Sequence, residues 1–255
     1  MTEIIKPPKP LGRKAYGSIA HLSCSRIGPG DHFVHAGQEI ICTEKPRKGD
    51  RIIVTEKLDG ACMAVANING RIVALSRAGY LSKDTPYEHL KLFGDYVSEN
   101  HDTFAGMLAP GERIVGEWLG MAHGTLYDSR HELFNPFVAF DIFRGNNRIL
   151  YDEFLDRVGM AGVVCAFCIH DADIACPVDM ALGAISVCDI LAKYPVHGYH
   201  GAVEPVEGAV WRVEREGRVD FLAKYVRRDK IDGKYLPEIS GAEPIWYWHP
   251  TEKAK

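Results

Sequence analysis

The sequence predicts an α+β fold in which antiparallel sheets carry flanking helices. Two hairpin signals support this class: the pairs Asn69-Gly70 and Glu216-Gly217 each lie between two β-prone runs. Strands that come in hairpins, with helical stretches between them, favour this class over a doubly wound parallel sheet.

The expected elements follow from local patterns. β-prone runs predict strands at 51–55, 61–67, 71–76, 113–118, 137–143, 209–214 and 218–226. Helices are expected at 87–107, at 152–158 and from Pro177 toward Tyr194, because proline is favoured at the start of a helix. Gly28-Pro29-Gly30 predicts a loop over 25–31.

Composition is that of a globular domain. The chain has 255 residues, of which 46% are hydrophobic and 25% charged, and this is enough to bury a core. The net charge of −4 argues against a protein that coats nucleic acid mainly by electrostatics. The start of the chain does not resemble a signal peptide, so we expect a cytoplasmic location.

Seven cysteines, an odd number, favour a reducing compartment over a disulfide framework. Cys165 and Cys168 form a C-x-x-C pair near His170 and Cys176, so a zinc knuckle is one interpretation. The other is a buried strand over 163–169, which is continuously apolar. We favour the strand because there is no second C-x-x-C pair.

The string Glu56-Lys57-Leu58-Asp59-Gly60 contains a candidate nucleophile, since a lysine placed at a strand end before a tight turn can be held in position. The pattern K-x-D-G alone is weak, because residue frequencies give it by chance in roughly one chain of this length in twenty. Lys230 heads a second copy. Only Lys57 follows a β-run and precedes a hairpin, so we interpret Lys230 as a surface or nucleic-acid contact.

Six short motifs follow one another in a fixed order: E-K-L-D-G at 56–60, S-R-A-G at 76–79, V-G-E-W at 115–118, A-F-D-I at 139–142, V-E-G-A-V at 206–210 and F-L-A-K-Y at 221–225. In this order they resemble the covalent nucleotidyltransferases, which include ATP-dependent ligases and capping enzymes. The resemblance is closest to the nick-sealing RNA ligases of bacteriophage and bacterial type. It implies a nucleotidyltransferase (ATP-grasp-like) fold.

The resemblance also implies the site residues and cofactors. Lys57 would attack the α-phosphate of ATP, with Glu56 beside it in the nucleotide site. Five other residues would share the binding and metal roles: Arg77 and Lys224 on phosphate, Glu117 on ribose, Phe140 on adenine, and Glu207 on Mg²⁺ or Mn²⁺. Asp141 would be a second metal ligand. The catalytic residues would be Lys57, Glu207 and Lys224.

The residue chemistry agrees with these implied roles. No glycine-rich phosphate loop is present, so lysines and carboxylates must hold ATP. Adenylyl transfer develops negative charge on the α-phosphate and the leaving pyrophosphate, and cations must lie there. A second cation near Lys57 would favour its neutral, nucleophilic form.

Some positions depart from the family pattern. Leu222 stands where the family often has a further lysine, so one phosphate contact is either lost or supplied elsewhere, with Arg227 and Arg228 as candidates. Cys62 replaces a usual asparagine. His21 and His32 lie in N-terminal loops from which they could touch substrate.

Residues 1–255 are expected to form one adenylyltransferase domain without the C-terminal OB-fold or helical domain of related ligases. We expect a monomer, with an accessory protein in place of that domain.

The predicted function is an ATP-dependent RNA ligase that forms lysyl-AMP, transfers AMP to a 5′-phosphate and joins it to a 3′-hydroxyl, with nicked duplex as substrate. Two alternatives stay open. One is a DNA ligase or a GTP-dependent capping nucleotidyltransferase. The other is a non-catalytic module that binds nucleotide or nucleic acid.

Overall fold

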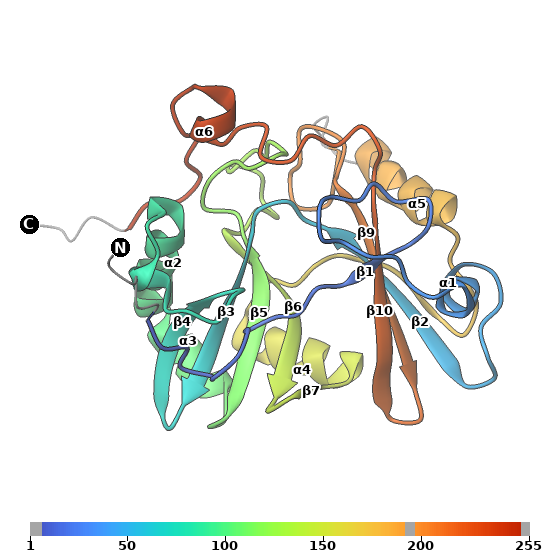
Figure 1. Cartoon of the computed structure of the whole chain (residues 1–255), viewed down its shortest axis with the longest axis horizontal. Helices are drawn as coiled ribbons and strands as arrows, with labels where there is room; N and C mark the ends of the chain where they lie inside the picture. The colour runs from blue at the N-terminus through green and yellow to red at the C-terminus, as the bar shows by residue number, and fades with distance from the viewer. Residues whose placement is uncertain (1–6, 192–196, 251–255) are drawn as a thin grey trace, which may run out of the picture.

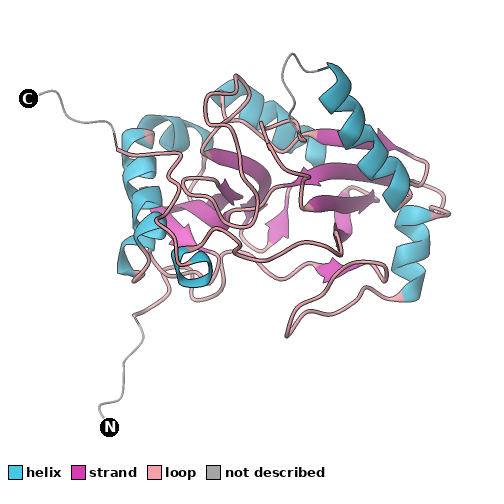
Figure 2. Cartoon of the chain, turned by 90° about the horizontal axis from the view of Figure 1, so that it is seen from above, coloured by secondary structure: helices cyan, strands magenta, loops and turns pink. Residues whose placement is uncertain are grey.

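The computed structural model of the chain describes residues 7–191 and 197–250. Two five-stranded sheets lie side by side, and helices lie around the outside of the strands (Figure 1, Figure 2). The α+β class predicted from the sequence is therefore confirmed. Each helix in the described part of the chain is too short or too polar to cross a bilayer.

The first sheet has the strand order β1-β10-β9-β2-β8, and the second has the order β4-β3-β5-β6-β7. Among the described strands only β1 and β10 pair in parallel. The first sheet comprises β1 (Ala20–His21), β2 (Asp50–Lys57), β8 (Cys168–Ala172), β9 (Gly208–Arg215) and β10 (Arg218–Val226). The second comprises β3 (Ala61–Ile68), β4 (Arg71–Ser76), β5 (Glu112–Trp118), β6 (Phe137–Arg144) and β7 (Asn147–Arg148).

The helices are short and flank these sheets. They are α1 (Ala36–Thr43), the 3-10 turn η1 (Ser82–Asp84), α2 (Glu88–Glu99), α3 (His101–Met107), α4 (Tyr151–Ala161), α5 (Val178–Leu191) and α6 (Pro237–Ser240). The helix expected from Pro177 is present as α5. Its expected end at Tyr194 lies outside the described residues.

Both predicted hairpins form. Asn69 and Gly70 adopt φ values of 52° and 83°, and Glu216 and Gly217 adopt 52° and 72°. Two consecutive residues with positive φ match the turn that suits the right-handed twist of paired strands. These two turns set the β3–β4 and β9–β10 registers.

Two predicted elements differ from the structure. The helix expected over 87–107 is two helices, which meet at Asn100, where φ is −105° and ψ is 23°. The strand expected over 163–169 is not continuous. Cys165 bridges to Ala139 in the second sheet, whereas Cys168 pairs with Thr55 in the first. The segment crosses from one sheet to the other and cannot be a single strand.

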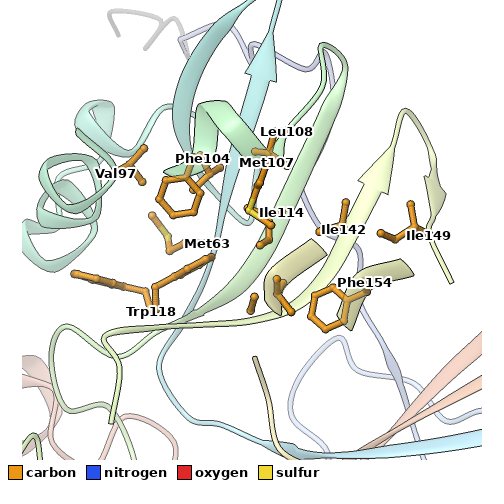
Figure 3. Packing of buried hydrophobic residues seen from close by; sticks show 14 of the residues in the cluster. Met63, Val97, Phe104, Met107, Leu108, Ile114, Trp118, Ile142, Ile149 and Phe154 are labelled. Atoms are coloured by element: carbon orange, nitrogen blue, oxygen red, sulfur yellow. The ribbon is translucent and has the colours of Figure 1, made fainter. Parts of the chain in front are cut away.

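Each sheet has a core of its own. Trp118, Phe104 and Phe154 belong to a buried cluster between the second sheet and helices α2, α3 and α4 (Figure 3). Trp211 lies in a separate cluster with residues of β2 and α1. Both tryptophans are fully buried, and each indole N–H donates to a backbone carbonyl at 2.8 Å. Each sheet is therefore held in place mainly by a buried cluster of its own.

The turn at Gly70 gives a stability test. Gly70→Ala is expected to lower the free energy of unfolding by about 1–2 kcal/mol, because a side chain disfavours positive φ. Gly106→Ala is the matched control. Gly106 lies in α3 with open space around its Cα, so alanine is expected to raise stability by about 0.5–1 kcal/mol. Urea unfolding measures both, and equal effects would contradict the turn assignment.

Candidate active site

A cleft of about 400 Å³ lies where the two sheets meet. Strands β2, β9 and β10 supply one wall, and β3, β5 and β6 supply the other. The N-terminal loop around Gly28 closes a further side. Seven of the residues singled out in the sequence line this cleft: Glu56, Lys57, Arg77, Glu117, Phe140, Glu207 and Lys224.

The chain passes from one sheet to the other through the turn Leu58–Gly60, directly after Lys57. The Gly60 N–H donates to Glu117 Oε1 at 3.0 Å, and the Asp59 N–H donates to the Tyr127 hydroxyl at 3.0 Å. A Cβ at Gly60 would lie 2.4 Å from the Trp118 carbonyl oxygen, so only glycine allows this close approach. These contacts fix the turn directly after Lys57 and so restrict the backbone from which its side chain extends.

Lys57 and Glu207 form an ion pair inside the cleft. The β2–β9 register pairs Lys57 with Gly208, which brings Glu207 alongside. The Lys57 Nζ lies 2.5 Å from Glu207 Oε2. Burial disfavours the charge on Lys57, but Glu207, Glu117 and Asp59 together outweigh burial and raise its pKa above the ordinary lysine value. The surrounding carboxylates therefore favour the charged form of Lys57, whereas the sequence analysis expected a second cation to favour its neutral form.

Glu117 lies on β5, next to Cys62 in the β3–β5 register. Burial raises the pKa of Glu117 to about 7, although Lys57 and the hydrogen bond from Gly60 act in the opposite direction. Burial also raises the pKa of the Cys62 thiol, and Glu117 adds to that effect. Burial on the second wall of the cleft therefore opposes the charged forms of both Glu117 and Cys62.

Two further cations and one aromatic ring complete the cleft. Lys224 on β10 lies 4.0 Å from Asp31, and burial together with Lys57 lowers its pKa. The exposed Arg77 donates to Ser18 Oγ at 3.0 Å. Phe140 is half-buried, and Tyr16 packs edge-on against it at 5.2 Å between ring centroids. The cleft thus combines basic groups from both sheets with a flat apolar ring from the second.

Asp141 does not lie with Glu207 in the described lining of the cleft. Its carboxylate is buried and accepts hydrogen bonds from three side chains: Arg148 at 2.6 Å, Arg212 at 3.1 Å and the Tyr16 hydroxyl at 3.2 Å. With these donors in place, the geometry favours a structural ion-pair network over the metal-ligand role expected from the sequence.

Lys230 is not at the surface, and the expectation of a surface or nucleic-acid contact is wrong. Only 1% of its side chain is exposed. Its ammonium pairs with the Asp59 carboxylate and donates to Thr125 Oγ1 at 2.8 Å. The two copies of K-x-D-G therefore meet in space, because the second lysine contacts the aspartate of the first.

The N-terminal segment, β1 and the loop after it, contributes residues that the sequence analysis did not emphasise. His21, Arg26 and Asp31 line the cleft. Arg227, Arg228 and His32, in contrast, are absent from the lining found among the described residues, whereas Leu222 and Cys62 belong to it. The loop signal at Gly28-Pro29-Gly30 predicted the bend. The contact with the cleft depends on the parallel pairing of β1 with β10.

The cleft of this α+β fold holds a half-buried lysine, a carboxylate and further cations, and such cations suit the binding of phosphate groups. The family model for RNA ligase matches residues 50–226. The chain belongs to the RNA ligase family. Comparison with curated proteins finds no match.

Solved structures of ligases resemble this chain at low identity. An archaeal ATP-dependent RNA ligase is 18% identical, with a TM-score of 0.45 over 69% of this chain and 42% of that one. An RNA ligase from Naegleria gruberi with pyrophosphate is 18% identical, with a TM-score of 0.47 over 76% of this chain and 53% of that one. A variant of that enzyme with ATP and manganese is also 18% identical, with a TM-score of 0.46 over 70% of this chain and 50% of that one. The chain spans about half the length of these structures.

The raised pKa of Glu117 predicts a pH effect on stability. A carboxyl group whose folded pKa lies above its unfolded value stabilises the fold below the unfolded pKa, and this stabilisation is lost as pH rises through about 7. Relative to the wild type, Glu117→Gln should therefore be more stable at pH 8 than at pH 5, by on the order of 1–3 kcal/mol.

Urea unfolding at the two pH values measures this difference. Glu132→Gln, which replaces an exposed glutamate outside the cleft, is the control. A Glu117→Gln effect that matches the control at both pH values would contradict the assignment.

Proposed function

We propose that the chain is an ATP-dependent RNA ligase of the nucleotidyltransferase fold, with Lys57 as the residue that carries AMP. The observation that supports this best is the meeting of Lys57 with Glu207 at 2.5 Å inside a cleft that Lys224 also lines. A lysine is seldom enclosed in this way for packing alone, since buried charges need partners and are selected where chemistry uses them.

Lys57 must lose its proton before it can attack phosphorus. Glu207 holds that lysine in the charged form, so we propose that Glu207 turns to another cation when nucleotide enters, and that the proton of Lys57 then passes to water. Glu207 fits a Mg²⁺ or Mn²⁺ site, because it offers carboxylate oxygens in the cleft, and such ions are commonly held by one or two carboxylates together with substrate phosphates. The ion would neutralise charge that develops on the phosphates.

In this proposal the remaining lining residues bind the other parts of ATP. Lys224 and Arg77 would hold the α-phosphate, and Phe140, backed by Tyr16, would stack on adenine. Glu117 would accept a hydrogen bond from ribose, and Glu56 would support the nucleotide site. Glu56 accepts a hydrogen bond from the Tyr199 N–H at 3.0 Å, which orients its side chain.

The reaction would have three steps. The Lys57 nitrogen forms a bond to the α-phosphorus as the bond to pyrophosphate breaks. The AMP then passes to the 5′-phosphate of an RNA end, which frees the lysine. A neighbouring 3′-hydroxyl attacks that phosphate, closes the strand and releases AMP.

We further propose that the chain is of the bacteriophage and bacterial nick-sealing type. In this proposal residues 1–255 act in the cytoplasm as one monomeric adenylyltransferase domain. The substrate would be nicked duplex RNA with 5′-phosphate and 3′-hydroxyl ends.

Covalent labelling tests the first step. Incubation with Mg²⁺ and α-labelled ATP should leave label on the denatured wild-type chain, and Lys57→Ala should abolish it. Lys91→Ala, which replaces an exposed helix lysine outside the cleft, should label normally. Label on the Lys57→Ala chain would exclude Lys57 as the nucleophile. Label from GTP alone would favour a capping enzyme, and no label from either nucleotide would favour a non-catalytic module.

Sealing of nicked duplexes tests whether the enzyme acts on RNA or on DNA. Four substrates with RNA or DNA on each side of the break should be compared, and sealing should require RNA on at least one side. Efficient sealing of all-DNA nicks alone would favour a DNA ligase. Because Glu207 pairs with Lys57 directly, Glu207→Gln should lower sealing by at least about 100-fold, as loss of a group that stabilises transition-state charge commonly does.

A further inference from the structure

The last described part of the chain returns to the active-site turn. Residues 227–249, here called the C-terminal strap, leave β10 and cross to the side of the molecule that carries α2 (Figure 1). Strap residues contact the rest of the fold at several points. The Tyr235 N–H donates to the His123 carbonyl at 2.7 Å, and Trp248 packs against Trp118 with 5.4 Å between ring centroids.

One strap residue contacts the turn Leu58–Gly60, which directly follows Lys57. Lys230 is buried, and its ammonium contacts the Asp59 carboxylate and the Thr125 hydroxyl. Gly124 closes this contact from the side, because a Cβ there would lie 2.6 Å from Lys230 Nζ and 2.8 Å from Asp59 Oδ2. The ion pair is therefore enclosed on several sides and has little room to rearrange.

The strap also supports the same turn by a second route. The Tyr127 hydroxyl accepts a hydrogen bond from the Asp59 N–H, and the Tyr127 N–H donates to the Tyr247 hydroxyl at 3.0 Å. The backbone and the side chain of Asp59 are thus both tied to groups that the strap holds. Asp59 is two residues from Lys57, so its position sets where the lysine side chain begins.

We propose that Lys230 is a positioning residue for Lys57, which acts by clamping Asp59 and with it the turn Leu58–Gly60. The inference rests on the proposed function, since it concerns the attack of Lys57 on ATP. Lys230 itself does not touch substrate in this proposal, because it is absent from the described lining of the cleft. Its loss should slow the attack with little change in how ATP is bound.

The test is single-turnover labelling with α-labelled ATP at several concentrations, followed over time. The endpoint reports the fraction of chains able to react, and the rate constant at saturating ATP reports how well Lys57 is placed. Lys230→Met is expected to lower that rate constant by about 10- to 100-fold, since small displacements of reacting groups have effects of this size. The ATP concentration that gives half the maximal rate should change less than about threefold.

Two further variants keep the test decisive. Thr125→Val removes one hydrogen bond to Lys230 without leaving a charge unpaired, so it should fold and slow labelling by about 2- to 10-fold. Lys234→Met is the matched control from the same strap. Lys234 pairs with Glu204 at 2.6 Å, but 43% of its side chain is exposed, and it should label at the wild-type rate and endpoint.

The outcomes separate the two proposals. Wild-type chain that takes no label from ATP overturns the proposed function and this inference with it. Labelled wild type, together with variants at Lys230 and Thr125 that react at the wild-type rate, overturns the positioning role alone. A lowered endpoint with an unchanged rate constant also overturns it, because Lys230 would then support only the folded state.

Discussion

The turn Leu58–Gly60 is the constraint on which the site depends. It joins β2 of one sheet to β3 of the other, and each sheet is packed on a core of its own. The backbone N–H groups of Asp59 and Gly60 donate to the Tyr127 hydroxyl and the Glu117 carboxylate, and Gly60 approaches the Trp118 carbonyl too closely for any other residue. A lysine placed just before this turn must face the space between the sheets.

The charge balance around Lys57 follows from that placement. Three carboxyl groups surround it, and their attraction for a positive charge exceeds the cost of burial. The fold therefore favours the protonated form of Lys57, which pairs with the Glu207 carboxylate. In the proposed reaction, nucleotide and metal would release the lysine by competing for Glu207, so that the amine becomes reactive only once its substrate is bound.

Buried ion pairs elsewhere in the molecule also hold the two sheets and the turn Leu58–Gly60 in place. Asp141 joins Arg148 and Arg212, and it thereby links β6 and β7 of one sheet to β9 of the other, behind the cleft. Lys230 joins the C-terminal strap to Asp59. Breaking a buried pair by removing one partner is costly, since the other charge stays unpaired. These pairs fix the two sheets and the turn Leu58–Gly60 relative to one another.

The sequence by itself determined the local features: the hairpins at Asn69-Gly70 and Glu216-Gly217, most strands, and the family motifs with Lys57 at their head. Turns and strand patterns depend on neighbouring residues, so they can be read from short segments. Only the tertiary structure decided that Lys230 is buried on Asp59, that Asp141 lies outside the described cleft lining, and that 163–169 crosses between sheets. Each of these depends on contacts between residues that are distant in the chain, and a lysine or an aspartate has the same local pattern whether its partner is water or a buried charge.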